Sequence, residues 1–253
     1  MRINNNIMAM NAHNQLKMNN FKQGKSIEKL SSGLRINRAA DDAAGLAVSE
    51  KMRGQIRGMS QAQRNAQDGI SLVQTIEGAM NEVSDMLVRM KELSVQKQNG
   101  TYQATDTANI TLEMNSLDAE IDNIFDNTKF NGKNAFGTAF SIVIDDAASK
   151  SLKVSVGDLG SPANDNVSAI EAKIGSVSSA RAQLGAWQNR LEHTVNNLGT
   201  TVENLQASES RIRDTDMAAE MMNFTKFNIL QQASQSMLAQ ANMAPQGVLQ
   251  LLG

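Results

Sequence analysis

The sequence predicts a mainly α protein, a coiled-coil bundle of long helices that carries one small β-hairpin. Aromatic residues make up only 4% of the 253 residues, and proline occurs only at positions 162 and 245. This composition favours long helices over a sheet-rich fold. Apolar residues also recur at heptad spacing along two long segments, whereas strict alternation is confined to one short stretch.

The two ends of the chain predict helices that need partners. The first 27 residues carry Ile3, Ile7, Met10 and Phe21, and seven asparagines lie within the first twenty positions. The last 27 residues contain no charged residue, yet their apolar residues recur at helical spacing. Isolated helices of this kind are marginal in water. We therefore expect both ends to be mobile in the free chain and to become helical among other protein chains.

A connector and two helices follow the amino-terminal segment. Residues 30–46 (LSSGLRINRAADDAAGL) are punctuated by glycine and change from basic to acidic, which is typical of a connector. A long helix follows, because apolar or small residues recur every seven positions from Met59 to Leu87, and Gly100 suits its end. A shorter helix then returns antiparallel, with apolar residues at Ile110, Met114, Leu117, Ile121 and Ile124.

Residues 138–158 predict the hairpin, and a last long helix follows it. Apolar residues alternate on both sides of the turn-rich residues 145–149. The helix after the hairpin has a seven-residue apolar seam, which consists of Ile170, Val177, Leu184, Leu191, Leu198, Leu205 and Ile212. Such a helix spans roughly 63 Å and needs other helices beside it.

The composition argues against an enzyme. The chain has no cysteine, which excludes disulfides, thiolate nucleophiles and thiolate metal sites. His13 and His193 lie on separate helical segments, and neither has a second histidine at metal-ligand spacing. We expect the acidic pairs 41–42 and 145–146 to cap or turn the chain rather than to bind a cation or transfer protons. The sequence thus predicts no catalytic residues, no metal and no cofactor.

Lipid and nucleic acid are also poor partners for this chain. No stretch approaches the ~20 apolar residues that cross a bilayer, and asparagines interrupt the apolar residues of a cleavable secretory signal. Residues 227–253 lack the basic face of an interfacial helix. With a net charge of −2 and only sparse basic residues near the amino terminus, nucleic-acid binding is not expected. Burial among protein chains is the better interpretation.

Three motifs carry a close resemblance to a known family. They are residues 30–46, residues 63–78 (QRNAQDGISLVQTIEG) and residues 229–242 (ILQQASQSMLAQAN), the last followed by PQGVLQLL. Together with MRINNNI at 1–7, LGAWQNR at 184–190 and SRIRDTD at 210–216, they resemble bacterial flagellin, the filament subunit of the flagellum. The likeness covers residues 1–134 and 170–252, so the chain is similar to a minimal flagellin without large variable outer domains.

The resemblance implies how the helices are arranged. Residues 1–42 and 214–253 would pair as inner-core terminal helices, and residues 43–213 would form the outer-core bundle with the hairpin. The implied polymerisation core consists of Ile3, Ile7, Met10, Phe21, Leu230, Met237, Leu238 and Leu249. In a helical polymer each side chain recurs at every subunit, so neutral Gln, Asn and Ser near the axis avoid repulsion between like charges.

The resemblance also implies partners and location. The expected product is an extracellular flagellar filament for swimming motility, a homopolymer of subunits that are secreted unfolded by the flagellar type III export apparatus. The expected partners are an export chaperone at the carboxy-terminal segment, a filament cap protein and hook-junction proteins. A hook–filament junction protein of the same axial family, with similar termini, is the alternative.

A host Toll-like receptor that detects flagellins is a further implied partner. Residues 87–96 (LVRMKELSVQ) are similar to the segment that this receptor contacts. The resemblance places candidate receptor contacts at Arg89, Glu92, Leu93, Glu113 and Arg190. Val88 and Lys91 depart from the Gln and Arg that are common in the family, and lysine cannot reproduce a bidentate arginine contact.

Overall fold

The computed structural model describes residues 6–157, 160 and 166–252, with side chains described as far as Met243. These residues form helices α1 (Ile7–Ser32), α2 (Ala43–Lys97), α3 (Ala104–Asn127), α4 (Val167–Arg213) and α5 (Met217–Leu252). The mainly α fold with paired terminal helices is confirmed. The chain divides into two compact units, called unit 1 (residues 1–54 and 205–253) and unit 2 (residues 55–204).

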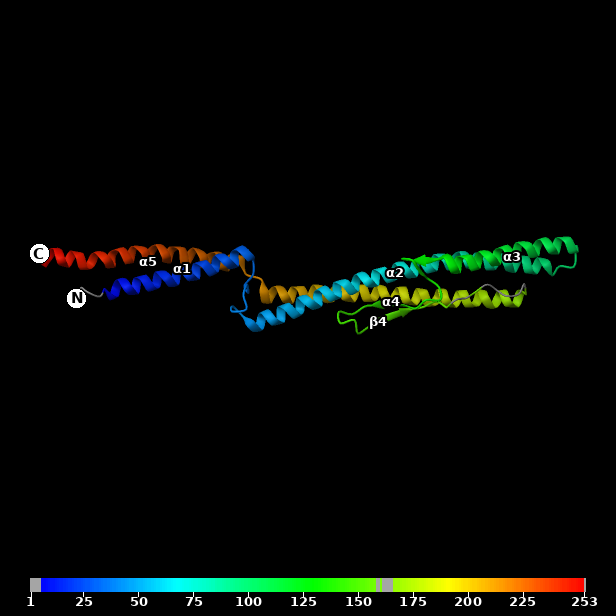
Figure 1. The fold of residues 1–253 in the computed structure, drawn as a ribbon, viewed down its shortest axis with the longest axis horizontal. Helices are drawn as coiled ribbons and strands as arrows, with labels where there is room; N and C mark the ends of the chain where they lie inside the picture. Colours follow the sequence, from blue (N-terminus) through cyan, green and yellow to red (C-terminus); the bar gives the residue numbers. More distant parts are fainter. Residues whose placement is uncertain (1–5, 158–159, 161–165, 253) are drawn as a thin grey trace. The chain divides into compact units, whose positions relative to one another are not determined.

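In unit 1, α1 and α5 lie side by side (Figure 1). Asn6 caps the start of α1, where its side-chain oxygen accepts the Ala9 N–H at 3.1 Å. Gly33 ends the helix with a φ of 72° and donates its N–H to the Lys29 carbonyl at 2.8 Å. This left-handed conformation favours glycine, so the glycine within the predicted connector fixes the helix end.

The two segments that join the terminal helices to α2 and α4 are hydrogen-bonded to each other. Leu34 and Asp214 form an isolated antiparallel bridge, and the Arg35 N–H donates to the Arg213 carbonyl at 2.7 Å. The Arg213 guanidinium also contacts the Glu50 carboxylate at 2.6 Å. Both connections are therefore held as a pair, by backbone hydrogen bonds and by an ion pair.

In unit 2, α2 and α4 run antiparallel. Lys91 of α2 pairs with Glu171 of α4 at 2.9 Å. Nearer the start of α2, a Cβ added to Gly69 would lie 3.3 Å from Leu191 Cδ1 of α4. Residue numbers therefore increase along one helix in the direction in which they decrease along the other. The predicted seam of α4 is confirmed over five positions, because Ile170, Val177, Leu184, Leu191 and Leu198 are buried. Its last two positions, Leu205 and Ile212, belong to unit 1 and are half-buried.

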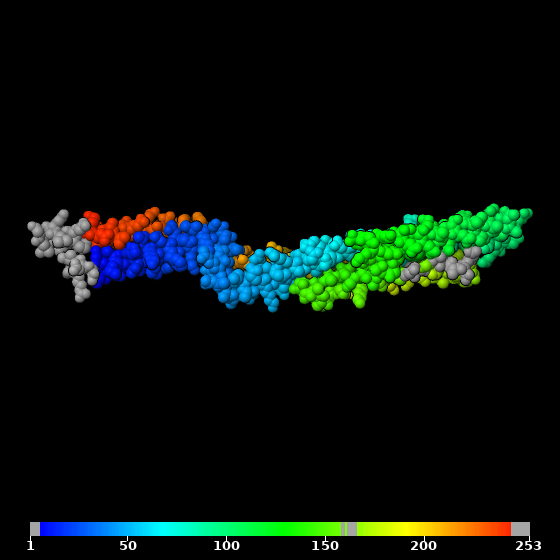
Figure 2. Space-filling view, viewed as in Figure 1, coloured from blue at the N-terminus to red at the C-terminus, as the bar shows by residue number. Residues whose placement is uncertain are grey.

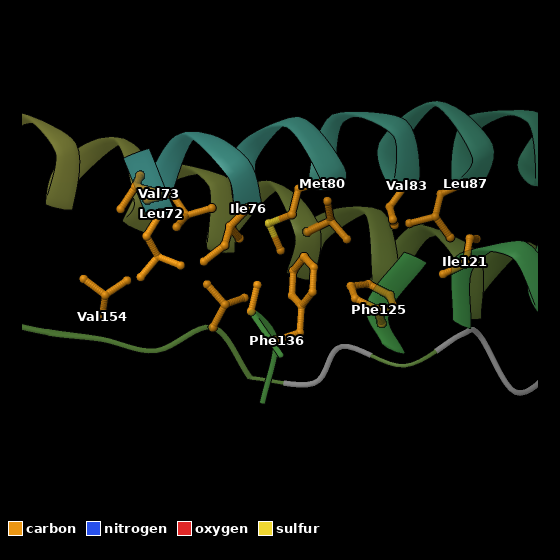
Figure 3. Packing of buried hydrophobic residues seen from close by; sticks show 14 of the residues in the cluster. Leu72, Val73, Ile76, Met80, Val83, Leu87, Ile121, Phe125, Phe136 and Val154 are labelled. Carbon is orange, nitrogen blue, oxygen red and sulfur yellow. The ribbon is translucent and has the colours of Figure 1, made fainter. Parts of the chain in front are cut away.

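The core of unit 2 gathers side chains from α2, α3, α4 and the strands. Phe125 of α3 and Phe136 meet edge to face, with ring centroids 4.9 Å apart, a favoured geometry for aromatic pairs. Figure 3 shows that α2 side chains face this pair and Val154; they are Leu72, Val73, Ile76, Met80, Val83 and Leu87. The core of this unit thus has the close packing of a stable domain.

The predicted hairpin is present in unit 2. It pairs β3 (Phe140–Val143) with β4 (Ser151–Val154) in antiparallel register, with Ile142 opposite Leu152. Both of these residues are buried, and so is Val154. One face of the hairpin therefore contributes to the core, as the alternation predicted.

Two glycines of α2 let the hairpin approach the helix closely. A Cβ added to Gly58 would lie 2.8 Å from Asp146 Cβ, in the turn between the strands. A Cβ added to Gly69 would lie 2.5 Å from Ile142 Cδ1. These positions are eleven residues apart, about three helical turns, so they lie on one face of α2. We call this face the hairpin seat.

A second, shorter hairpin precedes the predicted one. It pairs β1 (Lys129–Phe130) with β2 (Lys133–Asn134). Asn131 and Gly132 form its turn with φ values of 49° and 78°, as a tight two-residue turn requires. Strands of two residues produce no alternation pattern, so the sequence did not predict this hairpin.

Candidate functional site

The paired terminal helices expose most of their apolar side chains. Met8 is 73% exposed, Met222 69% and Phe21 67%. The exposed large apolar residues of α1 and α5 are Ile7, Met8, Met10, Met18, Phe21, Ile27, Met217, Met221, Met222, Ile229, Leu230, Met237 and Met243. An apolar surface of this extent on a helical pair marks an interaction site. We call it the terminal apolar face.

The side-chain hydrogen bonds that join α1 to α5 are between neutral groups. The Asn6 side-chain amide donates to the Ala241 carbonyl at 2.8 Å, and the Asn19 amide donates to the Ser234 hydroxyl at 3.1 Å. Ser26 is the only buried residue among the described side chains of the two helices. The pair therefore lacks a core of its own, in contrast to unit 2.

A groove runs between the two terminal helices on this face. Its volume is about 510 Å³, and its lining is mostly apolar. Met8 and Ala12 line it from α1, and Leu230, Ala233 and Met237 line it from α5. Figure 2 shows the atoms of α1 (blue) and α5 (red) in contact with each other along unit 1.

The structure locates most of the expected polymerisation residues on this face. Ile7, Met10, Phe21, Leu230 and Met237 are all exposed, and Leu238 is half-buried. Ile3 lies outside the described residues, and the side chain of Leu249 lies outside the described side chains.

Met8 is not in the expected polymerisation core, although it is among the most exposed apolar residues. Its position one residue after Ile7 gave no periodic signal. The groove that it shares with Met237 exists only because α1 and α5 are paired.

A second exposed site lies where α2 and α3 meet in unit 2. The Arg89 guanidinium contacts the Glu113 carboxylate at 2.9 Å and the Glu92 carboxylate at 3.2 Å. The hydrogen bonds to Glu113 and Glu92 raise the pKa of Arg89 above its ordinary value, and the bond to Glu113 has the larger effect. The three side chains form a charged cluster in contact with solvent, and exposed pairs of this kind contribute little to stability.

The structure does not bring all the candidate receptor contacts together. Leu93 is only 1% exposed, so its side chain belongs to the core of unit 2 and not to the exposed cluster. Arg190 is exposed on α4, next to Leu191, which lies against Gly69. Since Gly69 and Arg89 are twenty residues apart on α2, Arg190 lies roughly 30 Å from Arg89 along the bundle.

The acidic pairs hold the backbone, as predicted. Asp41 accepts the Arg38 N–H at 3.1 Å, and Asp42 accepts the Gly45 N–H at 2.8 Å at the start of α2. A hydrogen bond from Lys25 is the main cause that lowers the pKa of Asp41. In the hairpin turn, Asp145 accepts the Ser149 hydroxyl, which lowers its pKa.

Two other kinds of site are absent from the residues that the structure describes. Among them, no group of three or more His, Cys, Asp and Glu side chains is placed to hold a metal ion. Within the same residues, every helix is too short or too polar to cross a membrane.

A packed helical unit joined to a helical pair with an uncovered apolar face defines a structural protein that assembles with other protein chains. The sequence families agree with this class. The bacterial flagellin N-terminal helical region matches residues 3–140, and the bacterial flagellin C-terminal helical region matches residues 167–252. The chain belongs to the bacterial flagellin family, and it is a structural subunit of the flagellar filament.

Individual relatives match along nearly the whole chain. A flagellin of Halalkalibacterium halodurans is 51% identical, over 99% of each chain. The flagellar filament 31.3 kDa core protein of Treponema maltophilum is 43% identical, again over 99% of each chain. The crystal structure of Bacillus cereus flagellin is 32% identical and covers 53% of this chain and 88% of that chain, with a TM-score of 0.49.

Proposed function

We propose that the terminal apolar face is the surface through which this chain polymerises, and that α1 and α5 form the inner core of the filament. The observation that carries the proposal is the exposure of apolar side chains on a helical pair whose last 27 residues have no charge. Repetition of the subunit would place every charge near its own copies, so a neutral face suits a crowded axis. Unit 2, which has its own core, is then the outer part of the subunit.

The energetics agree with folding that is coupled to assembly. Full burial of a large apolar side chain is worth about 1.5–3 kcal/mol, and the thirteen exposed side chains on this face are between 38% and 73% exposed. Covering them gains on the order of 10 kcal/mol per subunit, before the entropy cost of ordering the helices. The helical α1 and α5 of the structure thus correspond to the assembled state, which the free subunit reaches only in part.

The proposal includes the export route and the partners that the family implies. An export chaperone would bind residues 227–253, because these apolar residues need cover before assembly. The subunit would leave the cell unfolded and add to the filament beneath a cap protein, with hook-junction proteins at the other end. The finished filament is extracellular.

Seeded filament growth tests the assembly surface. Purified subunits are added to short filament seeds, and filament length is measured by electron microscopy. Phe21→Asp adds a charge to an exposed position, so it should leave unit 2 folded and slow growth by about tenfold or more, since burial of a charged side chain between subunits is costly. Leu112→Asp, at a 64% exposed position of α3, is the matched control and should still elongate seeds.

The outcomes separate the competing assignments. Equal growth of the Phe21→Asp and Leu112→Asp variants would place the polymerisation surface elsewhere. If the wild-type subunit adds only a short layer to the seeds and then stops, the hook–filament junction assignment is correct instead.

A second function, recognition by the host Toll-like receptor, is favoured by the exposed cluster of Arg89, Glu92 and Glu113. We propose that this cluster is the receptor-contacting centre, with Leu93 supporting it from inside and Arg190 at a distant edge of the contact. The cluster needs little rearrangement to bind a partner, because its three side chains already contact solvent.

A receptor-reporter assay tests this second function. Arg89→Ala should raise the half-maximal concentration of subunit by about tenfold or more, as expected for an arginine at the centre of an interface. Arg64→Ala is the matched control, because Arg64 is also exposed on α2 but donates its hydrogen bonds to the amide oxygen of Gln61 rather than to a carboxylate. Unchanged signalling by the Arg89 variant would remove this cluster from the receptor site.

A further inference from the structure

Most methionines whose side chains the structure describes fall into two groups with opposite exposure, and Met52, Met59 and Met86 are half-buried. The chain has fifteen methionines and no cysteine. In unit 2, Met80, Met90 and Met114 are at most 2% exposed. On α1 and α5, every methionine with a described side chain is exposed; these are Met8, Met10, Met18, Met217, Met221, Met222, Met237 and Met243. The oxidisable sulfur atoms in reach of solvent are therefore concentrated on the terminal helices.

Two of these methionines occupy the groove between the helices. Met8 lines it from α1 and Met237 lines it from α5, and they are 73% and 65% exposed. Met222 is similarly exposed, at 69%, but does not line the groove. The three residues thus offer similar access to a small reagent from solvent while they differ in position.

We propose that Met8 and Met237 form a modification site at which a peroxide switches off assembly of the free subunit. This inference rests on the proposed role of the terminal apolar face. The thioether sulfur attacks one oxygen of hydrogen peroxide, the O–O bond breaks, and an S–O bond forms. The sulfur is oxidised by two electrons to the sulfoxide, and the other oxygen takes up the protons and leaves as water.

The sulfoxide acts through the polarity of the groove. Methionine is a flexible apolar residue that packs against irregular surfaces, whereas its sulfoxide carries a strong hydrogen-bond acceptor and disrupts methionine-rich interfaces. In an assembled filament that acceptor is either buried without a donor, or it takes the amide of Asn11, Gln15 or Gln240 in the same groove away from other contacts. Either outcome disfavours the assembled state, while the core of unit 2 is untouched.

Oxidation at this site distinguishes the free subunit from the assembled filament. Peroxide reaches Met8 and Met237 in the free subunit, because both are exposed on the single chain even when α1 and α5 are paired, and no neighbouring subunit covers them. Once neighbouring chains cover the groove, the same residues are shielded, so the completed filament resists the oxidant. Sulfoxide reductases reverse the modification, which makes the block reversible.

A competition within one pool of wild-type subunits tests the proposal. The pool is treated with hydrogen peroxide until about half of each exposed methionine is oxidised, as followed by peptide mass spectrometry. Seeds are added, and filaments are separated from free subunits by centrifugation. Sulfoxide at Met8 or Met237 should be depleted in filaments by about tenfold or more, whereas sulfoxide at Met86, a half-buried residue of unit 2 outside the terminal apolar face, should be depleted less than about twofold. Treatment with both sulfoxide reductases should restore incorporation.

The possible results are distinct. Equal sulfoxide content at Met8 and Met237 in filaments and free subunits would overturn the inference, as would oxidation of these residues no faster than that of Met80. If untreated subunits fail to extend the seeds, the proposed assembly function fails and this inference fails with it.

Variants locate the effect independently of the pool. The double variant Met8→Leu and Met237→Leu cannot form sulfoxides at these positions, and leucine is close to methionine in volume. Each variant is compared with its own untreated sample. The double variant should keep more of its growth after peroxide than the wild type does, whereas Met222→Leu should lose about as much growth as the wild type. A loss of growth in the treated double variant equal to that of the treated wild type would assign the effect to other methionines.

Discussion

Replacement of Gly58 by alanine tests the hairpin seat of α2. An added Cβ would lie 2.8 Å from Asp146 Cβ and 3.0 Å from Asp146 Cα. Neither atom can rotate away, so the turn of the hairpin must move by a few tenths of an ångström. Gly78, on the same helix, is the matched control, because a Cβ there meets no atom within 4 Å.

The two substitutions share one free-energy term and differ in another. Both gain helix propensity of about 0.8–1.0 kcal/mol. Gly78→Ala should therefore stabilise the protein by about 1 kcal/mol and raise its Tm by about 2–4 °C. Gly58→Ala adds an overlap that costs about 1–3 kcal/mol, so its net effect lies between about zero and about 2 kcal/mol of destabilisation.

Thermal unfolding followed by circular dichroism gives the two Tm values, and hydrogen exchange shows where the change acts. The Ile144 N–H donates to the Lys150 carbonyl at 3.1 Å across the hairpin, so its exchange reports on this turn. Exchange at Ile144 should accelerate in the Gly58 variant and not in the Gly78 variant. If Gly58→Ala stabilises the protein as much as Gly78→Ala does, with unchanged exchange, the hairpin is not seated on Gly58.

Three further predictions concern the core, the charges and the terminal helices. Leu184→Ala should lower the free energy of unfolding by about 3–5 kcal/mol in urea titrations, because Leu184 is fully buried, whereas Leu112→Ala at an exposed site should change it by less than about 0.5 kcal/mol. A hydrogen bond from Arg213 holds the pKa of Glu50 below its ordinary value of 4.5, so this contribution is present above pH 4.5 and is lost as pH falls through the lowered pKa. Filaments followed by light scattering should therefore lose stability on acidification, and Glu50→Gln should flatten that dependence; equal pH profiles would contradict the role of this pair. Limited proteolysis of the free subunit should cut α1 and α5 before α2, and equal resistance of all three helices would refute coupled folding and assembly.

Much of the fold could be predicted from the sequence, because helical periodicity and capping are local properties. The seam from Ile170 to Leu198 is buried as its heptad spacing predicted. The predicted connector is shorter in the structure, where α1 ends at Ser32 and α2 begins at Ala43. Caps decided these boundaries, since Gly33 ends one helix and Asp42 accepts a backbone N–H at the start of the next.

The hairpin seat could not be predicted from the sequence in the same way. Small residues in the first half of α2 indicated that another backbone would approach there, but they did not indicate which one. Gly58 and Gly69 meet Asp146 and Ile142, which lie more than seventy residues further along the chain. Such a contact depends on how the strands fold back over the helix.

The sequence by itself determined that the chain is made of long helices with apolar faces, that its last 27 residues carry no charge, and that no thiol is present. The tertiary structure decided which of those faces are covered. Met8 and Met80 are the same residue in the same kind of helix, yet one is 73% exposed and the other fully buried. The physical reason is that periodicity shows which face of a helix must be buried, whereas the side chains that bury this face come from other segments. In unit 2 the chain supplies those segments, and on α1 and α5 it leaves the face open.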